Sequence, residues 1–181
     1  MASAVCPGLS LAKRLLMPMH MVLDSPSCMR HNRKVNMERF SLLDISGDIG
    51  ISTAGATLSD VFVNAGMALY CLTTDIKAVR EQLSREVHVE AATCDVLLVR
   101  FLNELIFLLD SEQFIGHRIE IDALQCDLHC SEPVFLSARI QGEEFSPVRH
   151  EQRLLLKAAT YHKLRLEQQK DGWYAEVIFD I

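Results

Sequence analysis

The 181-residue sequence contains no apolar run that approaches the roughly 20 residues of a membrane-spanning helix. It also lacks the glycine-rich loops that bind nucleotide phosphates, Gly-x-Gly-x-x-Gly and the Walker sequence. Neither a Gly-x-Ser-x-Gly elbow nor a His and acid pair at metalloprotease spacing is present. These absences argue against a membrane-spanning protein, a nucleotide-binding enzyme and the common hydrolases.

The composition is typical of a soluble globular protein, with 49% apolar and 23% charged residues. A chain of this length can bury a core without disulfides or metal ions. The six cysteines follow no regular framework, so we predict reduced thiols in a cytoplasmic protein. They are Cys6, Cys28, Cys71, Cys94, Cys126 and Cys130.

Charge divides the chain into two parts. Residues 1–36 carry five basic side chains and one acidic side chain, a net charge of +4, while the whole chain has −6. Residues 37–181 therefore carry −10. Because phosphate contacts need Lys and Arg, we expect this acidic body to bind a protein or a cation rather than nucleic acid.

The same boundary separates two kinds of sequence pattern. Residues 1–36 lack clean periodicity and hold five of the methionines. We predict a disordered tail or an upstream extension there, with a fragment of a transit peptide as the alternative. Residues 37–181 form the predicted folded domain.

Apolar spacing within 37–181 predicts two helices among at least seven strands. Thr57 and Asp60 resemble a capping box at the start of the first helix. An Asp-Gly turn at 171–172 predicts a hairpin. The predicted helices cover 58–72 and 94–109, and the predicted strands include 40–52, broken at 46–48, 85–91, 134–140, 154–166 and 173–181. This order predicts an α+β fold, with both helices packed on mostly antiparallel sheet.

Asp48 is an acid flanked by glycines between apolar residues, which is unusual in a strand. One interpretation is a turn aspartate that bonds its own backbone. The other is a ligand for a cation. Asp180 and the carboxylate of Ile181 place two more negative groups at the end of an apolar strand, either on a solvated edge or at a site for a hard cation.

A zinc site is a further possibility, because Cys126, His129 and Cys130 could supply three ligands. In a strand, however, the two cysteines share a face and the histidine points away. Two half-buried thiols and an exposed histidine are the simpler interpretation.

Several segments, in order, resemble the archease family over residues 37–181. The opening Leu43–Ile51 resembles the family's Asp-His-Thr-Ala-Asp-Ile-Gly, and Lys157–His162 resembles its Lys-Ala-Val-Thr-Tyr-His strand. The other matching segments are Leu102–Asp110, Gly142–Pro147, Asp171–Trp173 and Asp180–Ile181.

The resemblance implies an α+β fold related to strand-helix-strand-strand modules. It also implies a non-catalytic protein that binds a divalent cation, most often described as calcium. Such proteins help the RtcB-type RNA ligase of tRNA splicing to become guanylylated and to turn over repeatedly. The implied ligands are Asp48, Asp180 and the carboxylate of Ile181, which would repel one another strongly without a cation.

The chain departs from the family pattern in two notable places. Ile45 stands where the family usually has histidine, and an isoleucine neither binds metal nor titrates. The family often has a glycine shortly after the loop His-Glu, where this chain has Gln152 and Arg153. His150 and His162 match family positions and are interpreted as structural residues or as contacts near the site, while Tyr161 is predicted to pack.

Two other functions stay open at this point. One is a chaperone or binding module for other RNA-modifying enzymes, with a merely structural metal. The other is a small hydrolase that uses Asp48 and Asp180 as a metal-activated pair. The absence of any substrate-pocket signature ranks the hydrolase last.

Overall fold

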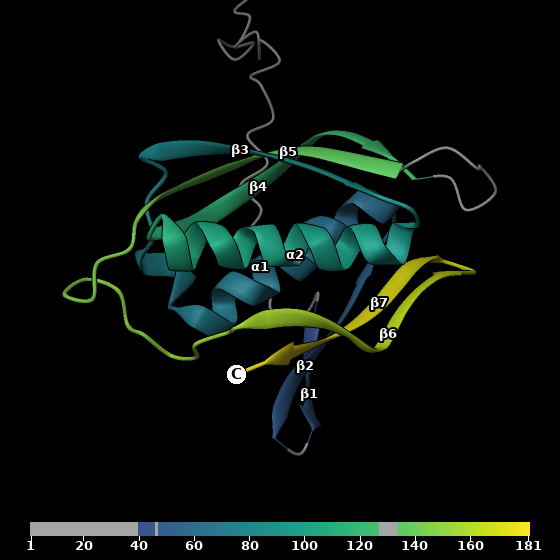
Figure 1. The fold of residues 1–181 in the computed structure, drawn as a ribbon, viewed down its shortest axis with the longest axis horizontal. Coiled ribbons are helices and arrows are strands. Elements are labelled where there is room, and N and C mark those ends of the chain that lie inside the picture. Colours follow the sequence, from purple (N-terminus) through teal and green to yellow (C-terminus); the bar gives the residue numbers. More distant parts are fainter. Residues whose placement is uncertain (1–39, 46, 127–133) are drawn as a thin grey trace, which may run out of the picture. The chain divides into compact units, whose positions relative to one another are not determined.

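The computed structural model describes residues 40–45, 47–126 and 134–181 (Figure 1). The predicted boundary between residues 36 and 37 lies outside this part of the chain, so the domain assignment stays a prediction. Within the described ranges, no helix has both the length and the apolar character needed to cross a membrane.

Two antiparallel sheets enclose a pair of helices. The strand order is β1-β2-β7-β6 in the four-stranded sheet and β3-β5-β4 in the three-stranded sheet. Figure 1 shows both α-helices between the two sheets. The elements are β1 (Phe40–Ile45), β2 (Asp48–Gly55), α1 (Leu58–Thr73), the 3-10 helix η2 (Ile76–Ala78), β3 (Leu83–Ala91), α2 (Cys94–Ser111), β4 (Phe114–Gln125), β5 (Val134–Glu144), β6 (Ala158–Gln169) and β7 (Gly172–Asp180). The predicted α+β class, two helices on antiparallel sheet, is confirmed.

The predicted capping box is present at the start of α1. Thr57 Oγ1 accepts the backbone N–H of Asp60 at 3.1 Å, and Asp60 Oδ2 accepts the backbone N–H of Thr57 at 3.0 Å. Each bond satisfies a donor that the first helical turn leaves without a partner.

The end of α1 is stabilised by a residue far away in the sequence. Its last turn contains no basic residue. Instead, Arg153 directs Nη1 to the carbonyl oxygens of Cys71 and Thr74, at 3.4 and 3.3 Å. Arg153 therefore caps the end of α1, where a positive charge is favourable.

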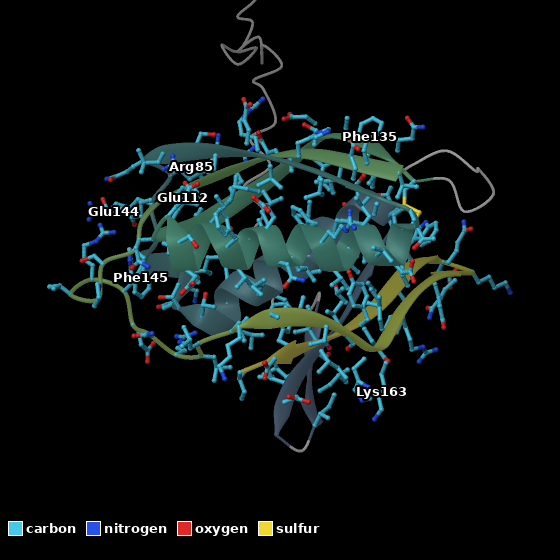
Figure 2. All side chains as sticks on the ribbon, in the orientation of Figure 1. Arg85, Glu112, Phe135, Glu144, Phe145 and Lys163 are labelled. Carbon is cyan, nitrogen blue, oxygen red and sulfur yellow. A yellow bond between two sulfur atoms is a disulfide. The ribbon has the colours of Figure 1, made fainter. Side chains whose placement is uncertain are left out.

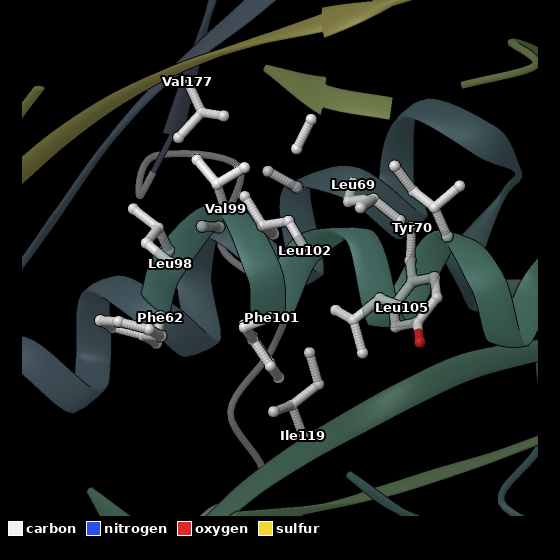
Figure 3. Packing of buried hydrophobic residues seen from close by; sticks show 14 of the residues in the cluster. Phe62, Leu69, Tyr70, Leu98, Val99, Phe101, Leu102, Leu105, Ile119 and Val177 are labelled. Atoms are coloured by element: carbon white, nitrogen blue, oxygen red, sulfur yellow. The ribbon is translucent and has the colours of Figure 1, made fainter. Parts of the chain in front are cut away.

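The core lies where the two helices cross between the sheets (Figure 3). The rings of Phe62 on α1 and Phe101 on α2 lie 5.9 Å apart, and both side chains are fully buried. Burial of one such side chain contributes about 1.5–3 kcal/mol to folding. Other buried members of the cluster are Leu69, Tyr70, Leu98, Val99, Leu102, Leu105, Ile119 and Val177.

The predicted long strand 154–166 is wrong in its first part, because β6 begins only at Ala158. The backbone N–H groups of Arg153 and Leu154 donate to the carbonyl oxygens of Thr73 and Leu72, at 3.0 and 3.2 Å. The end of α1 thus takes the hydrogen bonds that a sheet partner would have taken.

A bulge interrupts β6 between Thr160 and Arg165. Lys163 adopts φ 51°, in the left-handed region that few non-glycine residues visit. The bulge breaks the alternation of faces, so Tyr161 is 58% exposed. The prediction that Tyr161 packs is therefore wrong.

The prediction of reduced thiols is wrong for two cysteines. Cys94, the first residue of α2, is joined to Cys126, just after β4, by a disulfide with a Cα–Cα distance of 5.6 Å. The 32-residue separation hid this proximity from the sequence. Cys71 keeps a free thiol. Cys126 is therefore not available to the zinc alternative, whose other two ligands lie outside the described residues.

Candidate functional site

Asp48 and Asp180 lie at the same end of neighbouring strands. Antiparallel pairing of β2 with β7 matches Ile49 with Phe179. Asp48 precedes Ile49, and Asp180 follows Phe179, so the two aspartates lie one position beyond the last pair of this ladder.

Both carboxylates point away from the helices. Phe179 is fully buried on the inner face, and successive strand residues face opposite sides. Asp48 and Asp180 therefore share the outer face of the four-stranded sheet. Asp180 is exposed, and Asp48 is partly exposed. The register thus places the two aspartates at the same end of β2 and β7.

Ile181 lies beside this pair and has a cationic neighbour that the sequence interpretation did not include. Lys157 Nζ donates a hydrogen bond to a terminal oxygen of Ile181 at 2.8 Å, and the Lys157 backbone N–H donates to the carbonyl oxygen of Asp180 at 2.9 Å. The ammonium group offsets part of the negative charge that the sequence left unbalanced. Only the pairing of β6 with β7 reveals it.

The donor set suits a hard divalent cation. Asp48, Asp180 and Ile181 offer only oxygen atoms, which calcium prefers and zinc does not require. Within the described residues, no group of three His, Cys, Asp or Glu side chains is arranged to hold a metal. A hard cation bound here would need the terminal carboxylate of the main chain as a third ligand, and further oxygen atoms from water or a partner.

The flanks of the candidate site are apolar. Ile45 pairs with Asp48 across the β1–β2 hairpin, and Ala158 pairs with Asp180 on the other side. A Cβ atom placed on Gly50 would lie 3.2 Å from Ile45 Cδ1. The isoleucine at the family's histidine position therefore lies over Gly50, next to Asp48, and adds no ligand.

His150 occupies a different, buried cluster and has a structural role. Its side chain is fully buried, its Nδ1 accepts the Ser146 N–H at 3.0 Å, and its Nε2 lies 3.2 Å from Glu143 Oε1. Because Nδ1 accepts, Nε2 carries the proton and donates to the carboxylate. These bonds hold the segment between β5 and β6, as the structural interpretation of this histidine expected.

Glu143 is the acceptor at the centre of that cluster. Burial raises the pKa of its carboxyl, but hydrogen bonds from the Arg80 backbone N–H, from Arg149 and from His150 outweigh burial and hold the pKa below its ordinary value. A nearly buried carboxylate thus stays ionised by accepting several donors.

His162 lies on the bulge of β6 rather than in the candidate site. It is exposed, and its backbone N–H lies 3.4 Å from Thr160 Oγ1. Figure 2 shows the adjacent Lys163 directed outward from the same strand. His162 therefore has no ligand role toward Asp48 or Asp180 in this arrangement.

The Archease protein family model matches residues 40–181. This chain belongs to the archease family. The archease of Pyrococcus abyssi is 31% identical over 146 residues, which cover 80% of this chain and all of the relative. The archease of Sulfurisphaera tokodaii is 29% identical over 145 residues, with the same coverage of each chain.

Two solved archease-family structures share the fold. The solution structure of Methanobacterium thermoautotrophicum protein 1598 superposes with a TM-score of 0.66 at 28% identity, covering 80% of this chain and 100% of that one. The Thermotoga maritima crystal structure of "an archease, possible chaperone" gives 0.51 at 16% identity, covering 77% and 94%. At that identity the second likeness concerns the fold alone.

Proposed function

We propose that this archease-family protein is a cytoplasmic, metal-binding accessory protein that activates an RtcB-type RNA ligase. It would promote guanylylation and multiple turnover of the ligase in tRNA splicing or RNA repair. The ligase would perform the RNA chemistry, so the protein itself would not be an enzyme. Membership of the archease family supports this assignment.

The observation that carries the proposal is the convergence of Asp48 and Asp180 at one end of β2 and β7. Together with the carboxylate of Ile181, they would hold a divalent cation, which we propose to be Ca²⁺. A bound calcium ion would supply positive charge for phosphate groups on the ligase. The two aspartates would orient that charge at the outer face, and Lys157 would balance the terminal carboxylate when no cation is bound.

The acidic body supports a protein partner over direct RNA binding. Residues 37–181 carry a net charge of −10, which repels phosphate groups. RNA would therefore be contacted by the ligase, with this protein docked beside it.

Asp48→Asn and Asp180→Asn test the metal role. Each change keeps the side-chain shape but removes a negative charge, so we expect calcium affinity to fall about tenfold or more. Isothermal titration calorimetry with CaCl₂ measures that loss. Neither variant should stimulate ligation by the purified ligase under multiple-turnover conditions.

Asp171→Asn is the matched control, because Asp171 is an exposed aspartate in the β6–β7 turn, where Asn-Gly is as suitable as Asp-Gly. It should bind calcium and stimulate the ligase as the wild type does. Full stimulation by both site variants would contradict the metal role. Stimulation of a different RNA-modifying enzyme, with no effect on the ligase, would favour the chaperone alternative.

A further inference from the structure

A pocket of about 80 Å³ opens beside the C-terminal half of α2. Its walls come from α2, from the end of α1 and from the segment between β5 and β6; they include Ile106, Leu109, Phe145, Leu155 and Leu156. A cavity of about 150 Å³ is enough to hold benzene. This pocket is about half that size, which suits one branched aliphatic side chain.

Large apolar side chains are exposed near this pocket. Leu155, on its wall, is 59% exposed, and Phe107 of α2, one turn before Asp110, is 51% exposed. Figure 2 places Phe145 and Glu112 at the end of the molecule where α2 finishes. An apolar surface around a pocket is typical of a place where another molecule binds.

The charge on the α2 side of this surface is negative, whereas on the opposite wall Arg153 is paired with Glu151 at 2.9 Å. Asp110 is the charged residue among those that line the pocket. Glu104 and Asp110 lie three residues before and three residues after Phe107 on α2, so they flank its ring on the helix surface. Within the described ranges, neither carboxylate has an ion pair with a basic side chain.

We propose that this surface, made of the pocket with Glu104, Phe107, Asp110 and Leu155, docks a basic segment of a protein partner. The segment inserts one branched aliphatic side chain into the pocket and places Lys or Arg beside Glu104 and Asp110. We name it the α2 docking surface. In taking the RNA ligase as that partner, the inference rests on the proposed function.

The charge on this surface selects the class of partner. Carboxylates beside an apolar pocket repel RNA phosphates and anionic lipid headgroups, and they attract Lys and Arg. A single anchored side chain in a small pocket suits a local contact within a larger or transient interface. A basic protein segment with one aliphatic anchor matches both the negative charge of the surface and the small size of the pocket.

The site can be tested without the ligase. The probe is a short acetylated peptide with one leucine between Lys and Arg residues, titrated into the methyl-labelled full chain. We expect saturable NMR shifts at the methyl groups of Ile106, Leu109 and Leu155. Replacing the peptide leucine by alanine should weaken binding about tenfold, and replacing its basic residues by glutamate should abolish it.

Matched variants of the protein separate charge from fold. Asp110→Asn should weaken the peptide about two- to fivefold, and the Glu104→Gln/Asp110→Asn double variant about tenfold, as expected for exposed ion pairs. Asp171→Asn should leave peptide binding unchanged. Equal binding of the Leu and Ala peptides, or of the basic and acidic peptides, would overturn the site.

The ligase then identifies the partner. Purified ligase should bind the Glu104→Gln/Asp110→Asn variant about tenfold more weakly than the wild type. If the wild type binds and the double variant binds equally well, the α2 docking surface is not the ligase contact, although the proposed function stands. If the wild type does not bind the ligase, the proposed function fails, and the peptide result alone decides the site.

Discussion

Glu143 is a carboxylate with almost no contact with solvent, and its charge depends on three donors. Because its pKa is lower in the folded protein than in the unfolded chain, its stabilising contribution is complete above the ordinary pKa of 4.5. The contribution is lost as the pH falls through the lowered value, since protonation then favours unfolding.

Glu143→Gln should therefore lower the free energy of unfolding by about 2–3 kcal/mol at neutral pH, because the cluster loses an ionic acceptor. The difference from wild type should narrow as the pH falls below 4.5. Urea denaturation at several pH values measures it. Glu144→Gln is the control, because this neighbour is exposed. A difference that stays constant with pH would argue against the ionised cluster.

At the residue scale, Asp48 and Asp180 stood out as acids next to apolar strand residues, but only the resemblance to archeases implied that they are metal ligands. Lys157 was missed as a neighbour of the terminal carboxylate, because its contact depends on how β6 pairs with β7. The cap that Arg153 forms on α1 was missed for the same reason. Contacts between distant segments leave no local pattern.

Among the elements, the helices were predicted closely because their capping and apolar spacing are local signals. α1 begins after Thr57 as expected, and the hairpin turn at Asp171 and Gly172 follows from turn chemistry. The strand predicted from residue 154 was wrong in its first part, because carbonyl groups at the end of α1 accept the backbone N–H groups there. The β6 bulge was not foreseen, since Lys163 has no residue-type preference for a positive φ.

Both helices have a threonine at the N-cap position, but only one of the two makes a side-chain cap bond. Thr57 accepts the N–H of Asp60, whereas Thr93, at the start of α2, makes no side-chain cap bond. Thr57→Ala should lower the free energy of unfolding by about 1 kcal/mol. Thr93→Ala should cost clearly less. Chemical denaturation of both variants tests this, and equal losses would contradict the cap assignment.

For the molecule as a whole, the α+β class followed from the order of helices and strands. The division into two sheets did not, because strand order depends on tertiary pairing. The disulfide between Cys94 and Cys126 ties the start of α2 to the end of β4. Such a bond is uncommon in the reducing cytoplasm, so the redox state of the protein bears directly on the proposed location.

Reduction should destabilise the whole domain. A bridge that spans 32 positions contributes about 3–4 kcal/mol through the entropy of the unfolded chain. Calorimetry with and without reductant should show that loss in the oxidised wild type. The Cys94→Ala/Cys126→Ala variant should be insensitive to reductant. Equal sensitivity of the two proteins would show that the bridge does not form.

β6 is one edge of the four-stranded sheet. Two features prevent it from pairing with a further strand. The Asn103 side chain of α2 accepts the Ala159 N–H at 2.8 Å and donates to the Ala159 carbonyl oxygen at 3.1 Å, as a neighbouring strand would. Just beyond, the bulge at Thr160–Arg165 removes the regular ladder. A free extended chain therefore finds no continuous row of peptide groups there. We infer that β6 resists edge-to-edge aggregation, even in concentrated solution.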